Sequence, residues 1–353
     1  MLPSFAQRGG HHARLHNPTI FASWTQKLQT RARVTNLAIL LGALVCACSL
    51  LLNLSYIFGA PDAQQKLREI RNSGGARSGV SAPPASILTT VNRDRRVRDL
   101  QHLIVVAGHA IWQGCTPQER LHEEDWVLEP IQKEQQLLGT FFKHISKGAE
   151  LALQDPKSLL VFSGGQTRAS SLETEATSYL RLAHDTSLFG ATYNSSAPFP
   201  RATSETFALD SFQNVLFSIA RFHEVTGGWP RRITVISFGA KRKRFVELHA
   251  QALRWPNTEF VYVGIDPEEG TAAADMFKGE QQFGYKPYST DLYGCQGQLL
   301  EKRRKRNPFH RFHPYYTSSP EISGLLDFCP VPPVRNTRVV VYDGHLPWTN
   351  IAP

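Results

Sequence analysis

Short runs of consecutive apolar residues recur along the chain beyond residue 100. They have four or five residues each, are rich in β-branched side chains, and lie at 103–107, 159–162, 233–236 and 260–263. Such runs are typical of parallel strands that are buried on both faces.

Helical patterns separate these runs. Apolar residues repeat at helical spacing over 129–153, 206–223 and 242–253. Strands that alternate with helices predict an α/β domain with a Rossmann-like, doubly wound and mostly parallel sheet.

The N-terminal part has a different pattern. No charged residue occurs from Val34 to Pro61, a run of 28 residues. Its apolar centre, Leu37–Phe58, has 22 residues, and a bilayer core requires about 20. This predicts one uncleaved transmembrane helix, since a signal peptide has a shorter apolar core nearer to residue 1.

These patterns divide the chain into segments. They are a basic tail (1–33), a transmembrane helix (37–58), a flexible linker rich in Gly, Ser and Pro (62–99), the α/β domain (100–330) and a C-terminal tail (331–353) that holds one edge strand or none.

The tail 1–33 has no Asp or Glu, which favours a cytosolic N-terminus and a lumenal domain in the endoplasmic reticulum or Golgi. Asn194 begins a glycosylation sequon, Asn-Ser-Ser, in a segment rich in Ser and Pro, so we expect it to be exposed and to carry a glycan. A mitochondrial membrane is the alternative, because an acid-free basic tail also resembles a transit peptide.

Composition narrows the function only partly. The 39 Lys and Arg exceed the 30 Asp and Glu, which gives a formal net charge of +9 and suits nucleic acid, anionic lipid or a phosphorylated ligand. Nucleic acid is disfavoured, because the sequence has no basic platform interleaved with aromatic residues. The five cysteines are too few for a disulfide scaffold. In an oxidising lumen Cys295 and Cys329 are candidates to pair, with Cys115 left over.

Ligands of open α/β sheets bind at the carboxyl ends of the strands, so the residues that follow each run are candidates. The turn Ser163-Gly164-Gly165 follows the second run, and two glycines allow backbone N–H groups to close around an anion. Ser170–Glu173 is typical of a capping box that opens a helix. On this interpretation, Gly165→Val abolishes binding with little loss of fold. An ordinary tight loop is the alternative.

Acidic and basic residues add to this set. Asp210 and Asn214 are spaced i,i+4 on the helical pattern that follows Glu205, so they share a face that is either solvated or directed at a site. Lys241–Arg244 is a basic run after the third strand; such runs are usually solvated, but one or two of these side chains can reach a phosphate. We interpret the run Lys302–Arg306 as a solvated or lipid-headgroup-binding surface. His310 and His313 are too few for a zinc site.

As a set, these motifs resemble those of the YdcF/SanA/ElyC-like domain of unknown function, in its membrane-anchored fungal form. The segments that carry the resemblance are Gly108–Trp112, Phe162–Arg168, Glu175-Ala176, Asp210–Phe222, Lys241–His249, Asp291–Cys295 and Lys302–Tyr315. The chain departs from the bacterial pattern after the third strand, where Phe238–Lys241 replaces hydroxyl and histidine residues and Arg244 stands for the family arginine. The resemblance implies a Rossmann-like domain with a polar pocket at the strand ends. For a bacterial member it implies binding of S-adenosylmethionine.

Two functions compete. The first is a membrane-tethered enzyme, a hydrolase or transferase, that acts on a phosphorylated or nucleotide-like anion. Its candidate acids, bases or metal ligands are His109, Glu175, Glu205 and Asp210. Its candidate ligand-binding residues are Gly108, Ser163, Gly164, Gly165, Gln166, Thr167, Asn214, Lys241 and Arg244. The second is a binding module without chemistry, for S-adenosylmethionine or another ligand. All these side chains are expected to converge on one cleft.

Overall fold

The computed structural model of the chain describes residues 33–58, 85–134, 137–194, 196–267, 271–331 and 339–349. The chain divides into two compact units, Met1–Arg77 and Ser78–Pro353.

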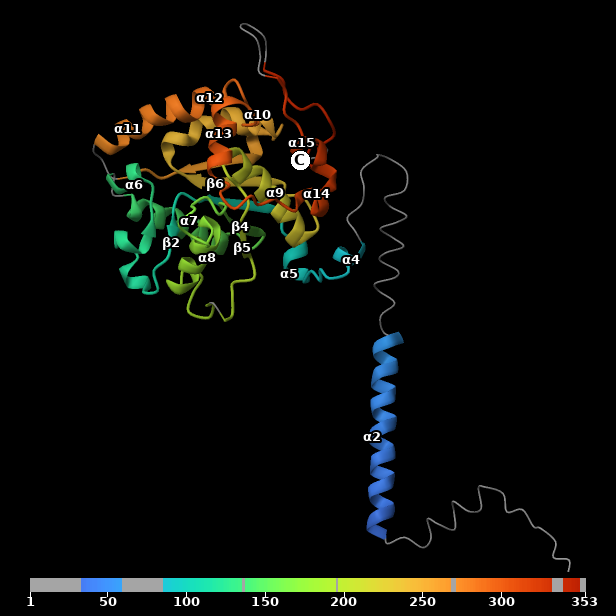
Figure 1. Cartoon of the computed structure of the whole chain (residues 1–353). Coiled ribbons are helices and arrows are strands. Elements are labelled where there is room, and N and C mark those ends of the chain that lie inside the picture. Colours follow the sequence, from blue (N-terminus) through green and yellow to red (C-terminus); the bar gives the residue numbers. More distant parts are fainter. Residues whose placement is uncertain are drawn as a thin grey trace, which may run out of the picture. The chain divides into compact units, whose positions relative to one another are not determined.

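A five-stranded sheet forms the centre of the second unit (Figure 1). Its strands are β1 (His102–Ala107), β4 (Ser158–Ser163), β5 (Ala202–Glu205), β6 (Arg232–Ser237) and β7 (Phe260–Gly264). All of them pair in parallel, in the order β5-β4-β1-β6-β7. The predicted α/β sheet is thus confirmed. Strand β5 was not predicted, because its sequence Ala-Thr-Ser-Glu is polar and only half-buried at the sheet edge.

The strand order creates a switch point at the centre of the sheet. From β1 the chain adds β4 and then β5 on one side, and it returns to add β6 and β7 on the other. The chain leaves β1 toward one edge of the sheet and leaves β6 toward the other edge. Because these two connections diverge, a crevice forms beyond the carboxyl ends of β1 and β6.

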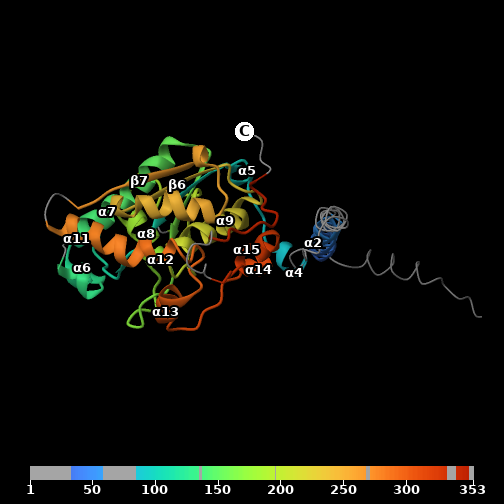
Figure 2. The same cartoon turned by 90° about the horizontal axis from the view of Figure 1, so that it is seen from above.

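Alternate residues of the strands face two separate cores. Leu103 and Val105 of β1 pack with the helix α9 (Ser211–Thr226). Ile104 and Val106 pack on the other face with α7 (Leu138–Gln154) and α8 (Glu175–Asp185). This period of two is the expected pattern for a strand between two helical layers, and Figure 2 shows the same layers from above.

Shorter elements surround the sheet. They are α4 (Ala85–Leu88), α5 (Arg95–Arg98), the hairpin β2 (Ile111–Trp112) and β3 (Trp126–Val127), α6 (Pro130–Glu134), a π-helical turn (Arg244–His249) that leads into α10 (Ala250–Ala252), α11 (Thr271–Glu280), a second π-helical turn (Gln281–Tyr285) that leads into α12 (Lys286–Tyr288), α13 (Gly297–Lys305), α14 (Tyr315–Ser318) and α15 (Ser323–Leu326). Single 3₁₀ turns lie at Pro117–Glu119, Glu123–Asp125, Gly239–Lys241, Asn257–Glu259 and Pro320–Ile322.

The structure corrects three expected boundaries. Arg93, which was assigned to the linker, donates from Nε to the Glu224 carbonyl at 3.0 Å, so the domain begins before residue 100. Leu346 and Trp348 of the expected tail are buried in the same core as β1, so the domain continues beyond residue 330. Helix α8 begins at Glu175 instead of at 170–173, because Thr174 caps it by accepting a hydrogen bond from the Thr177 N–H at 3.0 Å.

The first unit contributes one described element, α2 (Arg33–Phe58), which is helical through the whole predicted span (Figure 1). Its leucines are exposed, for example Leu40 at 67% and Leu52 at 70%. Within the residues that the structure describes, no helix reaches the length and apolar character needed to cross a membrane, and the transmembrane helix stays a prediction.

Candidate functional site

A pocket of about 350 Å³ opens at the switch point of the sheet. The ends of β1 and β6 form its base through Gly108, His109, Ser237 and Phe238. Several predicted site residues line it: Gly108, His109, Thr167, Glu175, Asp210, Asn214, Lys241 and Arg244. The predicted residues Ser163, Gly164, Gly165, Gln166 and Glu205 do not line it.

The glycine turn does not cradle an anion, contrary to the prediction. The Gly164 N–H donates to the Glu205 carbonyl at 3.0 Å, and the Gly165 N–H donates to the Ala208 carbonyl at 2.8 Å. Both amides are therefore already satisfied by the protein. The glycines are needed for close approach instead, since a Cβ on Gly165 would lie 2.7 Å from the Ala208 carbonyl oxygen.

Glu205 is buried and does not line the pocket. Its carboxylate accepts hydrogen bonds from the Ser163 hydroxyl at 2.7 Å, the Phe207 N–H at 2.7 Å, the Ala208 N–H at 3.3 Å and the Tyr315 hydroxyl at 3.0 Å. Burial raises the pKa of this carboxyl group, although these donors oppose the shift. With this network Glu205 holds the loop that receives the glycine turn, and Ser163 extends the network to the Asn214 amide oxygen at 3.2 Å.

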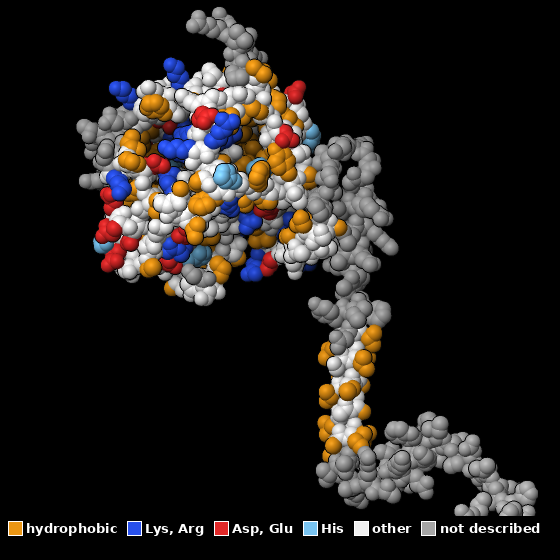
Figure 3. Space-filling model, in the orientation of Figure 1, with side chains coloured by type: hydrophobic (Ala, Val, Ile, Leu, Met, Phe, Trp, Pro, Cys, Tyr) orange, Lys and Arg blue, Asp and Glu red, His pale blue; other side chains and the backbone are white. Residues whose placement is uncertain are grey.

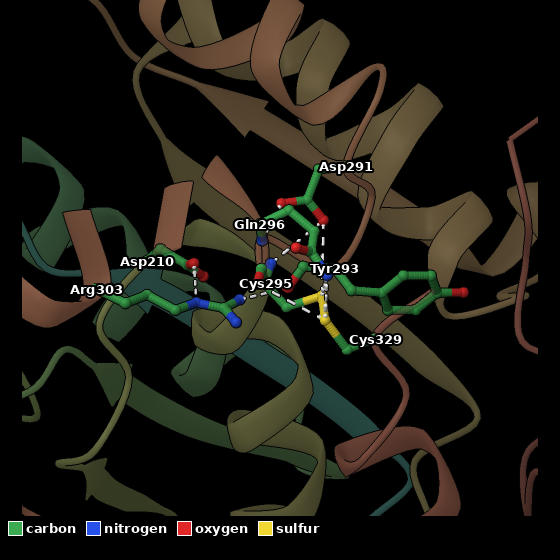
Figure 4. The surroundings of a disulfide bond; sticks show 7 residues. All are labelled: Asp210, Asp291, Tyr293, Cys295, Gln296, Arg303 and Cys329. Carbon is green, nitrogen blue, oxygen red and sulfur yellow. Dashed lines mark hydrogen bonds and ion pairs between the residues drawn. A yellow bond between two sulfur atoms is a disulfide. The ribbon is translucent and has the colours of Figure 1, made fainter. Parts of the chain in front are cut away.

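Asp210 touches the pocket, but its two oxygens are occupied. It is the N-cap of α9, where Oδ1 accepts from the Gln213 N–H at 2.9 Å. Oδ2 accepts from Arg303 Nε at 2.5 Å (Figure 4). Burial acts to raise the pKa of Asp210, but the charge and hydrogen bond of Arg303 outweigh it, and the pKa lies below its usual value. Asp210 therefore anchors Arg303 and is not a candidate base.

Glu175 is the predicted acidic residue that is best placed to act in the pocket. It is the first residue of α8, and its Oε1 accepts from the Thr167 hydroxyl at 2.6 Å. Oε2 lies close to the backbone at Gly108 and at Gly164. An added Cβ would lie 2.8 Å from Oε2 at Gly108 and 2.7 Å from it at Gly164. Glycine at both positions thus makes room for this carboxylate.

His109 is held as a neutral imidazole at the base of the pocket. Its Nδ1 lies 3.4 Å from Lys241 Nζ, and its Nε2 lies 3.1 Å from the Ser237 hydroxyl. When Lys241 is charged its ammonium group can only donate, so Nδ1 is then the accepting nitrogen and Nε2 carries the proton. Burial, and after it the charge of Lys241, hold the pKa of His109 well below its usual value. His109 is thus a hydrogen-bonding partner of Lys241.

Five basic side chains line the pocket wall, together with the acidic residues Glu129, Glu175, Asp210 and Glu280. Lys241 and Arg244 come from the segment after β6, Lys302 and Arg306 from α13 and its C-cap, and Arg168 from the loop after β4. In Figure 3 Lys and Arg side chains are spread over the visible face of the domain, and some lie beside a hollow in its upper part. Burial, reinforced by Arg244, lowers the pKa of Lys241 to about 7, and burial with Arg306 lowers that of Lys302 to about 8.

Some of these cations are paired and others are not. Arg168 lies 3.2 Å from Glu129, and Arg244 lies 3.1 Å from Glu280. Arg306 donates to the Leu209 carbonyl at 3.0 Å. Among the described residues, no carboxylate lies within ion-pair distance of Lys241 or Lys302. The pocket therefore holds positive charge that its own described acidic groups do not balance.

The run Lys302–Arg306 was predicted to be a solvated or lipid-headgroup-binding surface, and Lys302 and Arg306 were not among the predicted site residues. Their i,i+4 spacing places them on one face of α13, and Arg303 on the same side pairs with Asp210. Lys302 and Lys305 are both exposed residues, but of the two only Lys302 lines the pocket. The spacing was visible in the sequence, but it gave no indication that α13 packs across the strand ends.

A disulfide fixes the start of α13, as predicted for Cys295 and Cys329 (Figure 4). Beside it the Gln296 N–H donates to Asp291 at 2.8 Å, and Arg303 Nη2 donates to the Tyr293 carbonyl at 2.6 Å. Through these contacts the disulfide and the Asp210–Arg303 pair together position Lys302 and Arg306.

Ser211 and His249 form a pair that sequence reasoning missed. The Ser211 hydroxyl lines the pocket and lies 2.8 Å from His249 Nε2. Burial and the charge of Arg244 hold the pKa of His249 well below its usual value, so accepting a proton from Ser211 is costly. This pair secures the start of α9 and does not have the properties of a nucleophile with its base.

The chain is similar to one curated protein with no assigned activity. It is 30% identical over 260 residues to "Uncharacterized protein YOR238W" of Saccharomyces cerevisiae. The matched region covers 60% of this chain and 86% of the yeast protein. No known family profile matches the chain, and no solved structure matches it. The resemblance to the YdcF/SanA/ElyC-like domain stays a prediction. The chain belongs to the same protein family as the yeast protein YOR238W.

Proposed function

We propose that the pocket binds a small anionic molecule that carries a phosphate or a similar group. The observation that carries the proposal is the set of basic side chains at the switch point, of which Lys241 and Lys302 have no carboxylate partner among the described residues. Unbalanced charges in a partly desolvated pocket repel one another, and an anion relieves this repulsion.

The same charges disfavour the alternative ligand. S-adenosylmethionine carries a sulfonium and an ammonium group against one carboxylate, so its net charge is positive. A pocket lined by Arg168, Lys241, Arg244, Lys302 and Arg306 repels such a ligand more than it attracts the carboxylate. A phosphate dianion has the opposite charge and fits the forked donors of the arginines.

Binding of phosphate is tested by the melting temperature of the full chain at constant ionic strength. Inorganic phosphate and pyrophosphate should raise it relative to chloride, in proportion to the logarithm of their concentration. Lys302→Met should weaken phosphate binding by about 1.5–3 kcal/mol, the usual contribution of a hydrogen bond to a charged group.

Lys305→Met is the matched control, because it removes the same charge from the same helix at an exposed residue that does not line the pocket. It should leave the phosphate effect unchanged. Equal effects of the two substitutions would mean that only the overall charge matters, and the pocket would not be the binding site.

A substitution of Glu175 distinguishes an enzyme from a binding module. Its carboxylate lies in the pocket wall beside Thr167, where it is placed to accept a proton from water or from a substrate hydroxyl. In an enzyme, Glu175→Gln should abolish turnover of a phosphate ester and leave phosphate binding within about twofold. A binding module should show no turnover with or without this change.

We also propose that α2 attaches the protein to a membrane, with the α/β domain in the lumen of the endoplasmic reticulum or Golgi. The run of 28 uncharged residues around α2 and its exposed leucines support the attachment. The Cys295–Cys329 disulfide supports an oxidising compartment. Asn194 is exposed, as its sequon predicted, and its Oδ1 accepts from the Ser196 N–H at 2.9 Å.

The orientation is tested with protease on sealed microsomes. A lumenal domain should be spared, and endoglycosidase should increase its gel mobility if Asn194 carries a glycan. Digestion of the domain in intact vesicles would contradict the lumenal orientation.

A further inference from the structure

Part of the pocket wall is apolar. It consists of Ile131 on α6, Met276 on α11 and Phe283 on the π-helical turn that follows α11. We call these three residues the apolar wall. Helices α6 and α11 lie side by side at one end of the α/β domain in Figures 1 and 2, so the apolar wall borders one side of the pocket.

Two of the three residues of the apolar wall are exposed to solvent. Ile131 is 62% exposed and Phe283 is 61% exposed, although both line a pocket, whereas Met276 is partly buried against the core. Single exposed apolar residues are common on protein surfaces. Here, however, two of them line one pocket together, and Lys241 and Lys302 line the same pocket. A ligand with only a phosphate group would leave this wall in water.

We propose that the ligand of the pocket is an amphiphile, a lipid phosphate whose headgroup lies on the basic side chains and whose hydrocarbon chain lies on the apolar wall. This inference rests on the proposed phosphate binding and adds the chemical class of the ligand. Charge complementarity selects the headgroup. Burial of apolar surface selects the chain, because each methylene removed from water strengthens binding.

The backbone around the wall leaves room for such a chain. A Cβ on Gly279 of α11, which also lines the pocket, would meet no atom within 4 Å, so the space beside this helix is open. Gly284 follows Phe283, and there a Cβ would contact the Glu280 carboxylate and lie 2.6 Å from Arg244, which pair with each other. The apolar wall thus meets the Arg244–Glu280 ion pair at this turn.

The test compares ethyl phosphate with hexyl phosphate below its micellar concentration. The full chain is held in nanodiscs of neutral phosphatidylcholine, and affinity is taken from the ligand-dependent rise in melting temperature. Hexyl phosphate should bind at least about tenfold more tightly than ethyl phosphate, because four more methylenes contact the wall. Hexyl glucoside, which has the same chain without charge, should not bind at these concentrations.

Substitutions of exposed wall residues separate the two parts of the ligand. Phe283→Ser and Ile131→Ser should remove most of the advantage of hexyl phosphate and leave the affinity for ethyl phosphate within about twofold. Phe312→Ser is the matched control, because Phe312 is 92% exposed and does not line the pocket. It should change neither affinity.

The outcomes distinguish this inference from the proposed function. Equal affinities of ethyl and hexyl phosphate would overturn the lipid and leave a soluble phosphate compound as the ligand. Binding of hexyl glucoside as tight as that of hexyl phosphate would also overturn it, since the headgroup would then be irrelevant. Failure of ethyl phosphate to bind would refute the phosphate site itself.

Discussion

Gly165 shows how one residue can be identified correctly and assigned the wrong role. Its lack of a side chain is required by the loop at Phe207 and Ala208, whose backbone would lie 2.7–3.4 Å from a Cβ. Gly165→Val should therefore reduce the free energy of unfolding by about 1–3 kcal/mol, the usual cost of overpacking. The expectation that it abolishes binding with little loss of fold is corrected by this contact.

Urea denaturation measures this change, and Gly139→Ala is its control. Gly139 lies in α7 with no atom within 4 Å of a Cβ, so alanine should be neutral or stabilise the protein by about 0.5–1 kcal/mol. An equal midpoint for Gly165→Val and the wild type would show that the loop yields, and that the close approach is not needed for stability.

The lysines of the pocket make anion binding depend on pH. Lys241 faces His109, Arg244, Glu280, Lys302 and Arg306, and its pKa of about 7 means that it loses charge near neutral pH. A bound anion favours the charged form and raises this pKa, so the complex takes up protons that the free protein lacks. Affinity must therefore fall as the pH rises.

Sulfate is the suitable probe, because its own charge does not change in this range. Its dissociation constant should rise by about tenfold or more between pH 6 and pH 9. Lys241→Met should flatten the part of the profile near pH 7 and leave the part near pH 8, where Lys302 loses its charge. A flat profile for the wild type would contradict the assignment of these lysines to the binding site.

At the scale of secondary structure, the position of α13 depends on a disulfide bond. The Cys295–Cys329 disulfide joins residues 34 positions apart, and Arg303 of α13 pairs with Asp210 at the start of α9. Cys329→Ser should lower the free energy of unfolding by about 2–4 kcal/mol, the usual effect of opening such a loop. It should also weaken phosphate binding, since α13 carries Lys302.

Cys115→Ser is the control for this element, because Cys115 is an exposed free thiol. Thermal melts and phosphate titrations of the two variants give the comparison. Unchanged phosphate affinity in a destabilised Cys329→Ser protein would show that the Asp210–Arg303 pair alone positions α13.

The elements also show what the sequence alone reveals. Buried strands such as β1 and β6 could be predicted because a short, continuous run of apolar residues is typical of a buried strand. Strand β5 was missed, since its partners and not its own composition make it a strand. The site was predicted where residues follow strands directly, as at His109 and Lys241. Lys302 and Arg306 were missed because a distant segment brings them there.

At the scale of the whole chain, the described cores and the pocket belong to one of the two units. Both hydrophobic cores and the pocket consist of residues from Ser78–Pro353. Residues 78–353 should therefore fold without the first unit, with a free energy of unfolding and a phosphate affinity within about 0.5 kcal/mol of those of the full chain, because sites that share no partners usually do not couple. The full chain should stay in the membrane pellet after carbonate extraction, and residues 78–353 should be released. Loss of phosphate binding in the folded fragment would mean that the first unit completes the site. Release of the full chain would show that α2 does not anchor it.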